Sequence, residues 1–333
     1  MNKFIMLVGL PGSGKDTWIE NFIKNEKNKY IVLSSDNIRE ELYGDAAEQG
    51  DPQKVFSLMH KRLKYAINRG ENVICNATNI TYKNRRQAMS LIKDNKDYMR
   101  YAIIIATPYK QCLLNNKERA ENGGRFVPEE VVKRMYYSYE PPHYFEGFNK
   151  IEVYYPFIKP YLNISEELKR LKKVPHDNPH HSFSIGTHMD AAAKKCKKDI
   201  KSKKFSLGLD ENDNYKDYYN DTLIKVLSMH DIGKEKTKAF TNYKNEPTEI
   251  AHYYNHQNVG AYEYMFYMND IKGYNPIKDI FDCNVAAGIC YHMKPFEWKK
   301  GNTEKLRDKY KQLWGFRLFN LIEAVHKYDT EAH

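Results

Sequence analysis

The chain has 333 residues and a formal net charge of +10 at pH 7. This length predicts two domains, each with its own hydrophobic core. Because the sequence has neither a secretory signal nor an apolar run of membrane-spanning length, we expect a cytoplasmic protein with no membrane partner. The five scattered cysteines form no CxxC pair, which argues against a disulfide scaffold or a zinc ribbon. The positive charge suits nucleic acid, although lysine-rich composition is also what an AT-rich genome encodes.

A glycine-rich segment near the N-terminus lies between a predicted strand and a predicted helix. Residues 4–8 are continuously apolar, as in a buried strand, and residues 18–23 show the apolar spacing of a helix face. In this context glycines let backbone N–H groups surround phosphates, and the helix N-terminus adds partial positive charge. We therefore predict a site for a nucleotide triphosphate, with Lys15 at the β- and γ-phosphates, formed by Gly9, Gly12, Ser13, Gly14, Lys15, Asp16 and Thr17.

Asp16 departs from the usual pattern of such a loop. The residue after the lysine is normally Ser or Thr, whose hydroxyl binds Mg²⁺. A carboxylate can bind Mg²⁺ directly, but beside a triphosphate it also adds repulsion. We expect Thr17 to contact a phosphate and Asp16 to act on the metal or its waters.

A second predicted strand, residues 30–33, leads into Asp36 and Arg39. In an open parallel sheet the ligand lies at the carboxyl ends of the strands, so Asp36 can accept the proton of an attacking hydroxyl. Arg39 lies one helical turn later and can hold a phosphate of the acceptor. The alternative is that Asp36 only caps a helix over residues 37–42.

Further strands are predicted at 72–75, 101–106 and 151–155, the first of them after an amphipathic segment over 55–68. The strand at 72–75 ends in Asn76, where a second acidic metal anchor is often found. After the strand at 101–106, residues 116–128 combine a flexible Gly-Gly pair with Arg119 and Arg125, and Pro128 then opens another helix. This pattern predicts a lid that carries arginines to a transferring phosphoryl group, or else an exposed charged loop.

Residues 1 to about 155 resemble the P-loop kinases typified by phage polynucleotide 5′-kinase. The matching pieces are GLPGSGKDTW, SSDNIR, ICNATN with Arg85-Arg86 after it, and NKERAENGGRFVP. The resemblance implies an α/β domain over residues 1–158, with a parallel sheet, helices on both faces, and ATP and Mg²⁺ as cofactors. Some pieces are shared with kinases that act on sugars, aminoacyl-tRNA or cell-wall precursors.

Catalytic roles follow from the same resemblance. Lys15 would bind the phosphates, Asp36 would deprotonate a 5′-hydroxyl, and Arg39 would contact the acceptor phosphate. Arg119 would stabilise the transition state, with Arg125 as a second contact from the lid. Asp16 and Asn76 differ from the family's pattern at the metal.

The second half begins after a proline-containing, charged segment over 159–178, which we interpret as a link between domains. His188 begins or lies early in a helix, and an apolar helix over 223–229 ends in His230-Asp231. We expect His252 and His256, four residues apart, on one helical face. His292 follows in an apolar segment, and Asp329 in a helix near residue 333. Each histidine alone is more often structural than a metal ligand.

Taken in order, these residues resemble the HD phosphohydrolase family over about residues 176–333. The resemblance implies an all-α domain, residues 179–333, with one or two divalent transition metals that act on a phosphate ester. A first metal would bind His188, His230, Asp231 and Asp329. A second would bind His256 and His292, and less surely His252, with Asp231 between the two metals. Lys234 could orient the scissile phosphate, and a lysine-rich stretch over 194–204 would attract a polynucleotide or form a solvated surface.

The two halves together predict a bifunctional enzyme that acts on RNA or DNA ends. Its kinase would phosphorylate a 5′-hydroxyl, and its HD domain would hydrolyse a 3′-phosphate or a 2′,3′-cyclic phosphate. A ligase is a partner to expect, because ligation needs a 5′-phosphate and a 3′-hydroxyl. Two alternatives remain: a small-molecule or nucleotide kinase fused to an HD nucleotidase, and an ATP-gated P-loop module that regulates the HD hydrolase.

Overall fold

The computed structural model describes residues 1–157, 162–179, 182–209, 213–268, 282–298 and 303–332. The chain divides into two compact units, Met1–Lys159 and Pro160–His333. In the described residues, no helix has both the length and the apolar character needed to cross a membrane.

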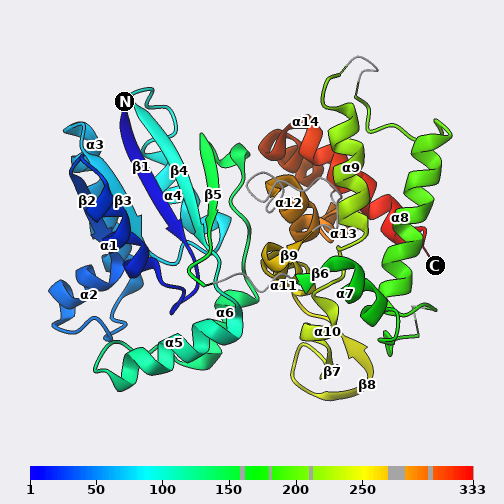
Figure 1. Cartoon of the computed structure of the whole chain (residues 1–333), viewed down its shortest axis with the longest axis horizontal. Helices are drawn as coiled ribbons and strands as arrows, with labels where there is room; N and C mark the ends of the chain where they lie inside the picture. Colours follow the sequence, from blue (N-terminus) through cyan, green and yellow to red (C-terminus); the bar gives the residue numbers. More distant parts are fainter. Residues whose placement is uncertain (158–161, 180–181, 210–212, 269–281, 299–302, 333) are drawn as a thin grey trace. The chain divides into compact units, whose positions relative to one another are not determined.

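A five-stranded parallel sheet forms the centre of the first unit (Figure 1). Its order is β2-β3-β1-β4-β5. The strands are β1 (Asn2–Val8), β2 (Tyr30–Ser34), β3 (Asn72–Asn76), β4 (Tyr98–Ile105) and β5 (Lys150–Tyr154). All of the strands predicted for this half are therefore present, and β1 lies in the middle, paired with β3 and β4.

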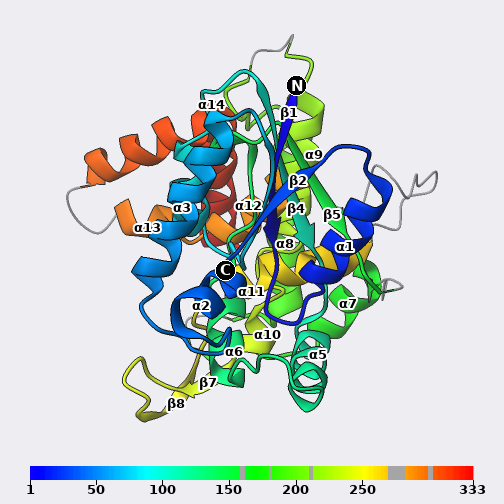
Figure 2. The ribbon, with the colours of Figure 1, turned by 90° about the vertical axis from the view of Figure 1, so that its left-hand side faces the viewer.

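Helices connect these strands and cover both faces of the sheet. They are α1 (Lys15–Asn25), α2 (Ser35–Tyr43), α3 (Pro52–Asn68), α4 (Tyr82–Ser90), α5 (Tyr109–Glu121) and α6 (Glu129–Tyr136), with a 3-10 turn η1 (Tyr144–Glu146). Strand β1 runs from the N-terminus toward the end of the sheet at which α2, α5 and α6 lie (Figures 1 and 2).

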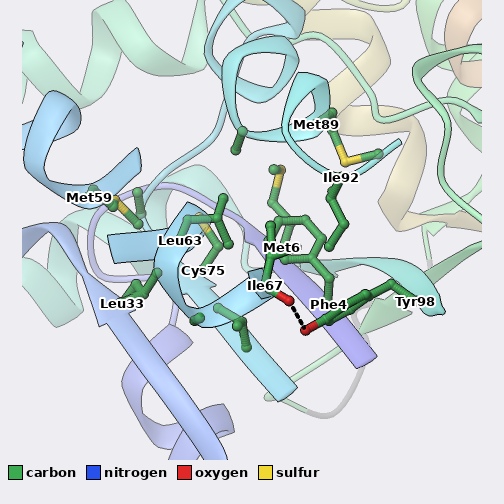
Figure 3. Close-up of a cluster of buried hydrophobic side chains, with 14 of the residues drawn as sticks. Phe4, Met6, Leu33, Met59, Leu63, Ile67, Cys75, Met89, Ile92 and Tyr98 are labelled. Carbon is green, nitrogen blue, oxygen red and sulfur yellow. Dashed lines mark hydrogen bonds between the residues drawn. The ribbon is translucent and has the colours of Figure 1, made fainter. Parts of the chain in front are cut away.

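The side chains of β1 alternate between two hydrophobic cores, one on each face of the sheet. Phe4 and Met6 pack in the cluster that includes Met59 and Leu63 of α3 and Met89 of α4 (Figure 3). The neighbouring residues of β1, Ile5 and Leu7, face the other way and pack in the cluster that contains Ile19 of α1. The expected α/β architecture of the first half is confirmed.

The second unit is mainly helical. Its helices are α7 (Ile164–Leu171), α8 (Ile185–Lys201), α9 (Lys216–Leu227), α10 (Lys234–Thr237), α11 (His256–Glu263), α12 (Cys283–Tyr291), α13 (Pro295–Trp298) and α14 (Thr303–Thr330), with a 3-10 turn η2 (Tyr264–Phe266). Helix α9 packs against α8, α12 and α14. A Cβ atom at Gly288 of α12 would lie 2.6 Å from Val226 of α9, so the two helices approach closely because this residue is glycine.

Three features of this unit differ from the expectations. An antiparallel hairpin, β7 (Ala239–Thr241) and β8 (Pro247–His252), and a short parallel pair, β6 (Leu162–Asn163) and β9 (Tyr267–Met268), supplement the helices. His252 ends β8 and His256 begins α11, so the two histidines do not share a helical face. Residues 162–178, expected in the link, belong to the second unit, because β6 pairs with β9 and α7 packs on α8.

A buried ion pair connects α4, which follows β3, to η1, which precedes β5. Arg85 of α4 is fully buried and donates to Glu146 at 2.8 Å (Nε–Oε2) and 2.7 Å (Nη2–Oε1). Its Nη1 donates to the carbonyls of Asn79, Ile80 and Glu140 at 3.0, 3.2 and 2.8 Å. Arg85 therefore has a structural role in this unit.

We predict that Arg85→Met destabilises the first unit by about 3–5 kcal/mol, because it leaves the Glu146 carboxylate buried and unpaired. Arg62→Met is the matched control: Arg62 forms an exposed pair with Glu41, so its loss should cost less than about 1 kcal/mol. Urea unfolding followed by hydrogen exchange of peptides from residues 1–157 measures both. Equal, small losses would contradict a structural role for Arg85.

Candidate active sites

The shape of the loop between β1 and α1 depends on Gly12. Gly12 has φ of 75°, in the left-handed region, and a Cβ atom there would lie 2.3 Å from the carbonyl oxygen of Cys112. Asn115 Nδ2 donates to the Gly12 carbonyl at 2.8 Å, and Thr107 Oγ1 donates to the Ser13 carbonyl at 2.8 Å. Residues between β4 and α5, and α5 itself, therefore hold the loop in its curled form.

Lys15 lies at the first position of α1, and its ammonium group points back across the loop. Nζ donates to the carbonyls of Gly9 and Leu10 at 3.1 and 2.9 Å. Burial lowers the pKa of Lys15, while the carboxylates of Asp16 and Asp36 act in the opposite direction. A cationic group held by carbonyls of the loop can transfer its hydrogen bonds to phosphate oxygens.

A cavity of about 760 Å³ brings the predicted residues of this half together. Its lining includes Gly12, Gly14, Lys15, Asp16, Thr17, Asp36, Arg39, Arg119 and Arg125. Gly9 and the buried Ser13 do not line this cavity. The two residues pack against each other within the loop, since a Cβ atom at Gly9 would lie 2.6 Å from Ser13 Oγ.

Asp36 lies in the first turn of α2, but it does not cap this helix. The cap is Ser34, whose side chain accepts a hydrogen bond from the Asn37 backbone N–H, so the capping alternative is wrong. Asp36 Oδ1 accepts from Arg39 Nη1 at 2.8 Å and also from Arg125 Nη1. The carboxylate is therefore held by two guanidinium groups through one oxygen.

The predicted lid is anchored at both ends by one buried amide. Asn116 of α5 donates to the Val127 carbonyl at 2.7 Å and accepts from the Val127 N–H at 3.1 Å. Its Oδ1 also accepts from Arg119 Nη2 at 2.9 Å. Between these anchors Gly123 has φ of 79°, and no atom lies within 4 Å of the place that a Cβ would occupy, so the chain turns there without obstruction. Movement of this loop stays a prediction.

In the second unit, two groups of histidines and carboxylates share Asp231. The first group contains His188 of α8, His230 and Asp231 after α9, and Asp329 of α14. Asp329 Oδ1 lies 2.8 Å from His188 Nε2 and 3.2 Å from His230 Nε2. Asp231 Oδ2 lies 3.4 Å from His230 Nε2. Four residues, from three parts of the sequence, thus direct donor atoms at one point.

The second group contains Asp231, His256 at the start of α11 and His292 at the end of α12. Asp231 Oδ1 lies 3.3 Å from His256 Nε2 and 3.9 Å from His292 Nε2, and these two nitrogens are 3.2 Å apart. Each oxygen of Asp231 therefore faces a different group. This carboxylate is suited to bridge two cations.

The hydrogen bonds of the histidines at Nδ1 orient their Nε2 atoms toward the centre. Nδ1 of His188, His230, His256 and His292 lies 2.8–3.2 Å from the carbonyl oxygens of Ala332, Leu227, Tyr253 and Ile289, respectively. Since a carbonyl only accepts, each Nδ1 carries a proton, and in the neutral imidazole the lone pair lies on Nε2. Nitrogen lone pairs that face one another at 3.2–3.4 Å repel, unless a proton or a cation lies between them.

The electrostatics of the site favour ionised carboxylates and a cation. Burial alone would raise the pKa of Asp231, but Lys234 and His230 hold it well below its usual value. Burial and the imidazoles of His256 and His230 lower the pKa of His292 to about 3. Although burial opposes the change, Asp231 and Asp329 raise the pKa of His230 to about 9. A metal binds neutral imidazole, so its binding would displace the proton of His230.

Lys234 and a histidine that the sequence patterns did not single out lie beside this site. Lys234 Nζ is 2.7 Å from Asp231 Oδ2 and 3.3 Å from His176 Nε2. His176 is buried, and burial together with the Lys234 charge lowers its pKa to about 4. No spacing pattern pointed to His176, which lies in the segment expected to be the link. His252 belongs to neither group and stacks on Tyr254.

One sequence-family model matches the N-terminal part of the chain. Residues 4–142 match the sequence model of a family described as an AAA domain (AAA_33). L-seryl-tRNA(Sec) kinase of Methanococcus maripaludis is 31% identical over 142 residues, which is 41% of this chain and 52% of that protein. A protein of Acanthamoeba polyphaga mimivirus, assigned as a bifunctional polynucleotide phosphatase/kinase, is 29% identical over 155 residues, 45% of this chain and 32% of that protein.

A chain in the solved structure of the Pnkp1/Rnl/Hen1 RNA repair complex is 23% identical, with a TM-score of 0.36, over 40% of this chain and 42% of that one. The chain thus spans about half or less of the length of these relatives. Its N-terminal part is a P-loop domain of the kinase-like kind.

We predict that Gly12→Ala abolishes nucleotide binding, because the added methyl group collides with the Cys112 carbonyl and forces the loop open. Gly44→Ala is the matched control: Gly44 also has a positive φ, 80°, but nothing lies near its Cβ position. The control should lose about 1–2 kcal/mol of stability through strain alone and keep its nucleotide affinity. Calorimetric titration with ATP tests this, and equal affinities for the two variants would contradict it.

Proposed function

We propose that the protein is a bifunctional enzyme that processes the ends of RNA or DNA. Its first unit transfers the γ-phosphoryl group of ATP to a 5′-hydroxyl, and its second unit hydrolyses a 3′-phosphate or 2′,3′-cyclic phosphate. The observation that carries the proposal is the presence, in one chain, of a phosphate-binding loop and of two histidine–carboxylate groups around Asp231. Both reactions prepare ends for joining, so a ligase is the expected partner.

In the kinase reaction, each residue around the cavity has its own role. Lys15 exchanges the carbonyls of the loop for phosphate oxygens, and Arg119 supplies charge to the transferring group. Asp36 accepts the proton of the attacking hydroxyl. Its Oδ1 is held by Arg39 and Arg125, which leaves the second carboxylate oxygen for that hydroxyl. Arg39, held by Asp36, can also bind the acceptor phosphate.

Three observations support a polynucleotide as the acceptor. The names of both relatives describe phosphorylation of an acceptor that is, or is attached to, nucleic acid. The net charge of +10 favours a polyanion. Phe56, Val131 and Met135 line the same cavity as Asp36, so an apolar surface is available beside the polar groups for a base.

In the second unit, the donor set fits divalent transition metals. Imidazole nitrogens and carboxylate oxygens are the ligands these ions prefer, and each histidine is oriented by a backbone carbonyl. His188, His230, Asp231 and Asp329 would hold one ion, and Asp231, His256 and His292 a second. Bound ions supply Lewis-acid and water-activating chemistry for phosphoester hydrolysis. Lys234, beside Asp231, would bind the scissile phosphate.

We predict that Asp36→Asn lowers the rate of 5′-phosphorylation by about 10²–10⁴-fold, because it removes the base while the loop that binds ATP stays intact. The measurement is transfer of labelled γ-phosphate from ATP to a 5′-hydroxyl RNA oligonucleotide with Mg²⁺. Asp45→Asn, an exposed acid beyond α2, is the control and should keep the wild-type rate.

Two outcomes would contradict the kinase proposal. If the wild-type protein labels a small-molecule acceptor but no oligonucleotide, a small-molecule kinase is the better description. If ATP binds, no acceptor is labelled, and ATP changes the rate of the second unit, the P-loop unit is a regulatory module.

We predict that His230→Ala removes bound transition metal and abolishes phosphate release from a 3′-phosphate or 2′,3′-cyclic phosphate end, while kinase activity persists. Metal content is measured by elemental analysis after reconstitution with Mn²⁺ or Ni²⁺. The control is His252→Ala, because His252 lies outside both groups. Equal metal content in the two variants would show that these groups do not form the metal site.

A further inference from the structure

Two residues that depart from the usual pattern of a P-loop kinase lie in direct contact. Asp16, in the first turn of α1, and Asn76, the last residue of β3, are 60 positions apart in the sequence. Asn76 Nδ2 donates to Asp16 Oδ1 at 2.7 Å. Both residues line the cavity that also contains Lys15, Thr17 and Asp36. Their unusual identities are therefore related to each other through space.

The chemistry of the two positions is the reverse of the usual arrangement. In P-loop enzymes a Ser or Thr hydroxyl after the lysine and a carboxylate at the end of a neighbouring strand together hold Mg²⁺. Here the carboxylate stands after the lysine, and the neutral group stands at the end of the strand. The pair carries one negative charge in either arrangement. The anionic group has changed places with the neutral one.

The surroundings of Asp16 leave its charge available to a cation. Lys15 donates to carbonyls of the loop and not to Asp16. Among the described residues, Asp16 has no ion pair, and its Oδ2 has no hydrogen-bond partner. Asp36, another carboxylate that lines the cavity, is in contrast paired with Arg39 and Arg125. Asp16 is thus an acid held in place by a neutral amide and not neutralised.

The burial of Asn76 explains how the amide can orient its partner. Asn76 is 6% exposed and belongs to the paired part of β3, opposite Ser34 of β2, whereas Asp16 is exposed. A carboxylate in the first turn of a helix would be favourable next to the helix dipole without any partner. That effect does not require a buried asparagine on another strand, so the contact points to a specific position for the carboxylate.

We propose that Asp16 and Asn76 have exchanged the usual roles: Asp16 is the anionic ligand of the Mg²⁺ that accompanies the nucleotide, and Asn76 positions its carboxylate. This inference rests on the proposed binding of ATP by the first unit. A carboxylate is a hard oxygen ligand and suits Mg²⁺, which keeps most of its waters and takes one or two protein carboxylates. The neutral Asn76 amide does not supply the negative charge that the Asp16 carboxylate provides.

The test is a cycle of variants that restores the usual arrangement: Asp16→Ser, Asn76→Asp and the double variant. Affinity for a non-hydrolysable ATP analogue is measured by calorimetry with Mg²⁺ and with EDTA, so that no turnover is needed. Asp16→Ser removes the proposed ligand, so the gain in affinity that Mg²⁺ provides should fall by about ten-fold or more, at least as much as the loss of an outer-shell partner costs in other metal sites. The affinity in EDTA should be unchanged or higher, because a negative charge beside the phosphates is removed.

Asn76→Asp should weaken binding of the analogue in EDTA, because two carboxylates would then repel each other where one hydrogen bond was, and Mg²⁺ should relieve that repulsion. The double variant should recover the gain to within a few-fold of wild type, since it has the hydroxyl and the carboxylate in the usual places. Glu20→Gln, which removes an exposed acid from the same helix, is the control for charge alone and should match wild type.

The outcomes separate this inference from the proposed function. A wild-type protein that binds no ATP analogue would overturn both. A wild-type protein that binds the analogue, with a Mg²⁺ gain that Asp16→Ser leaves intact, would overturn the exchange alone. A double variant as weak as Asp16→Ser would overturn the role of Asn76. Melting temperatures of the variants within a few degrees of wild type exclude misfolding as the cause of any loss.

Discussion

The parallel register of the first three strands is the constraint on which the first site depends. Ser34 of β2 pairs with Asn76 of β3, and Met6 of β1 pairs with Cys75, so the three strands end at nearly the same level. The residues that follow each strand therefore meet at one edge of the sheet. There the phosphate-binding loop, the carboxylate after β2 and the amide at the end of β3 surround one cavity. Helices pack on both faces of this sheet.

The second unit also brings distant residues to one place, but it does so through helix packing and not through strand register. The side chains that could bind a metal lie at the ends and in the interiors of helices, and their ligand atoms meet around Asp231. A backbone carbonyl orients each imidazole. Buried carboxylates and facing nitrogens are costly unless a cation satisfies them. Under the proposed function, phosphate satisfies the positive charges of the first unit. A metal satisfies the carboxylates and imidazole nitrogens of the second unit.

Not every buried charge in this protein belongs to a site. Arg85 and Glu146 satisfy each other completely, and the remaining donors of Arg85 reach backbone carbonyls. Asp36 is also paired, but it stays half-exposed and borders the cavity. Asp16 is the different case, because its partner is neutral. Arg85 and Glu146 are therefore structural, whereas Asp36 and Asp16 border the cavity and are candidates for chemistry.

The sequence by itself predicted the strands of the first unit, its loop and the ordered histidines, because continuous apolar runs and glycine spacing are local signals. It also predicted that His188, His230, Asp231 and Asp329 act together, through their resemblance to a family. Only the tertiary structure decided which residues meet. The contact of Asp16 with Asn76, the place of His176 beside Lys234, and the separation of His252 from His256 depend on strand register and helix packing. These are long-range choices, made by burial of apolar faces, and no spacing along the chain encodes them directly.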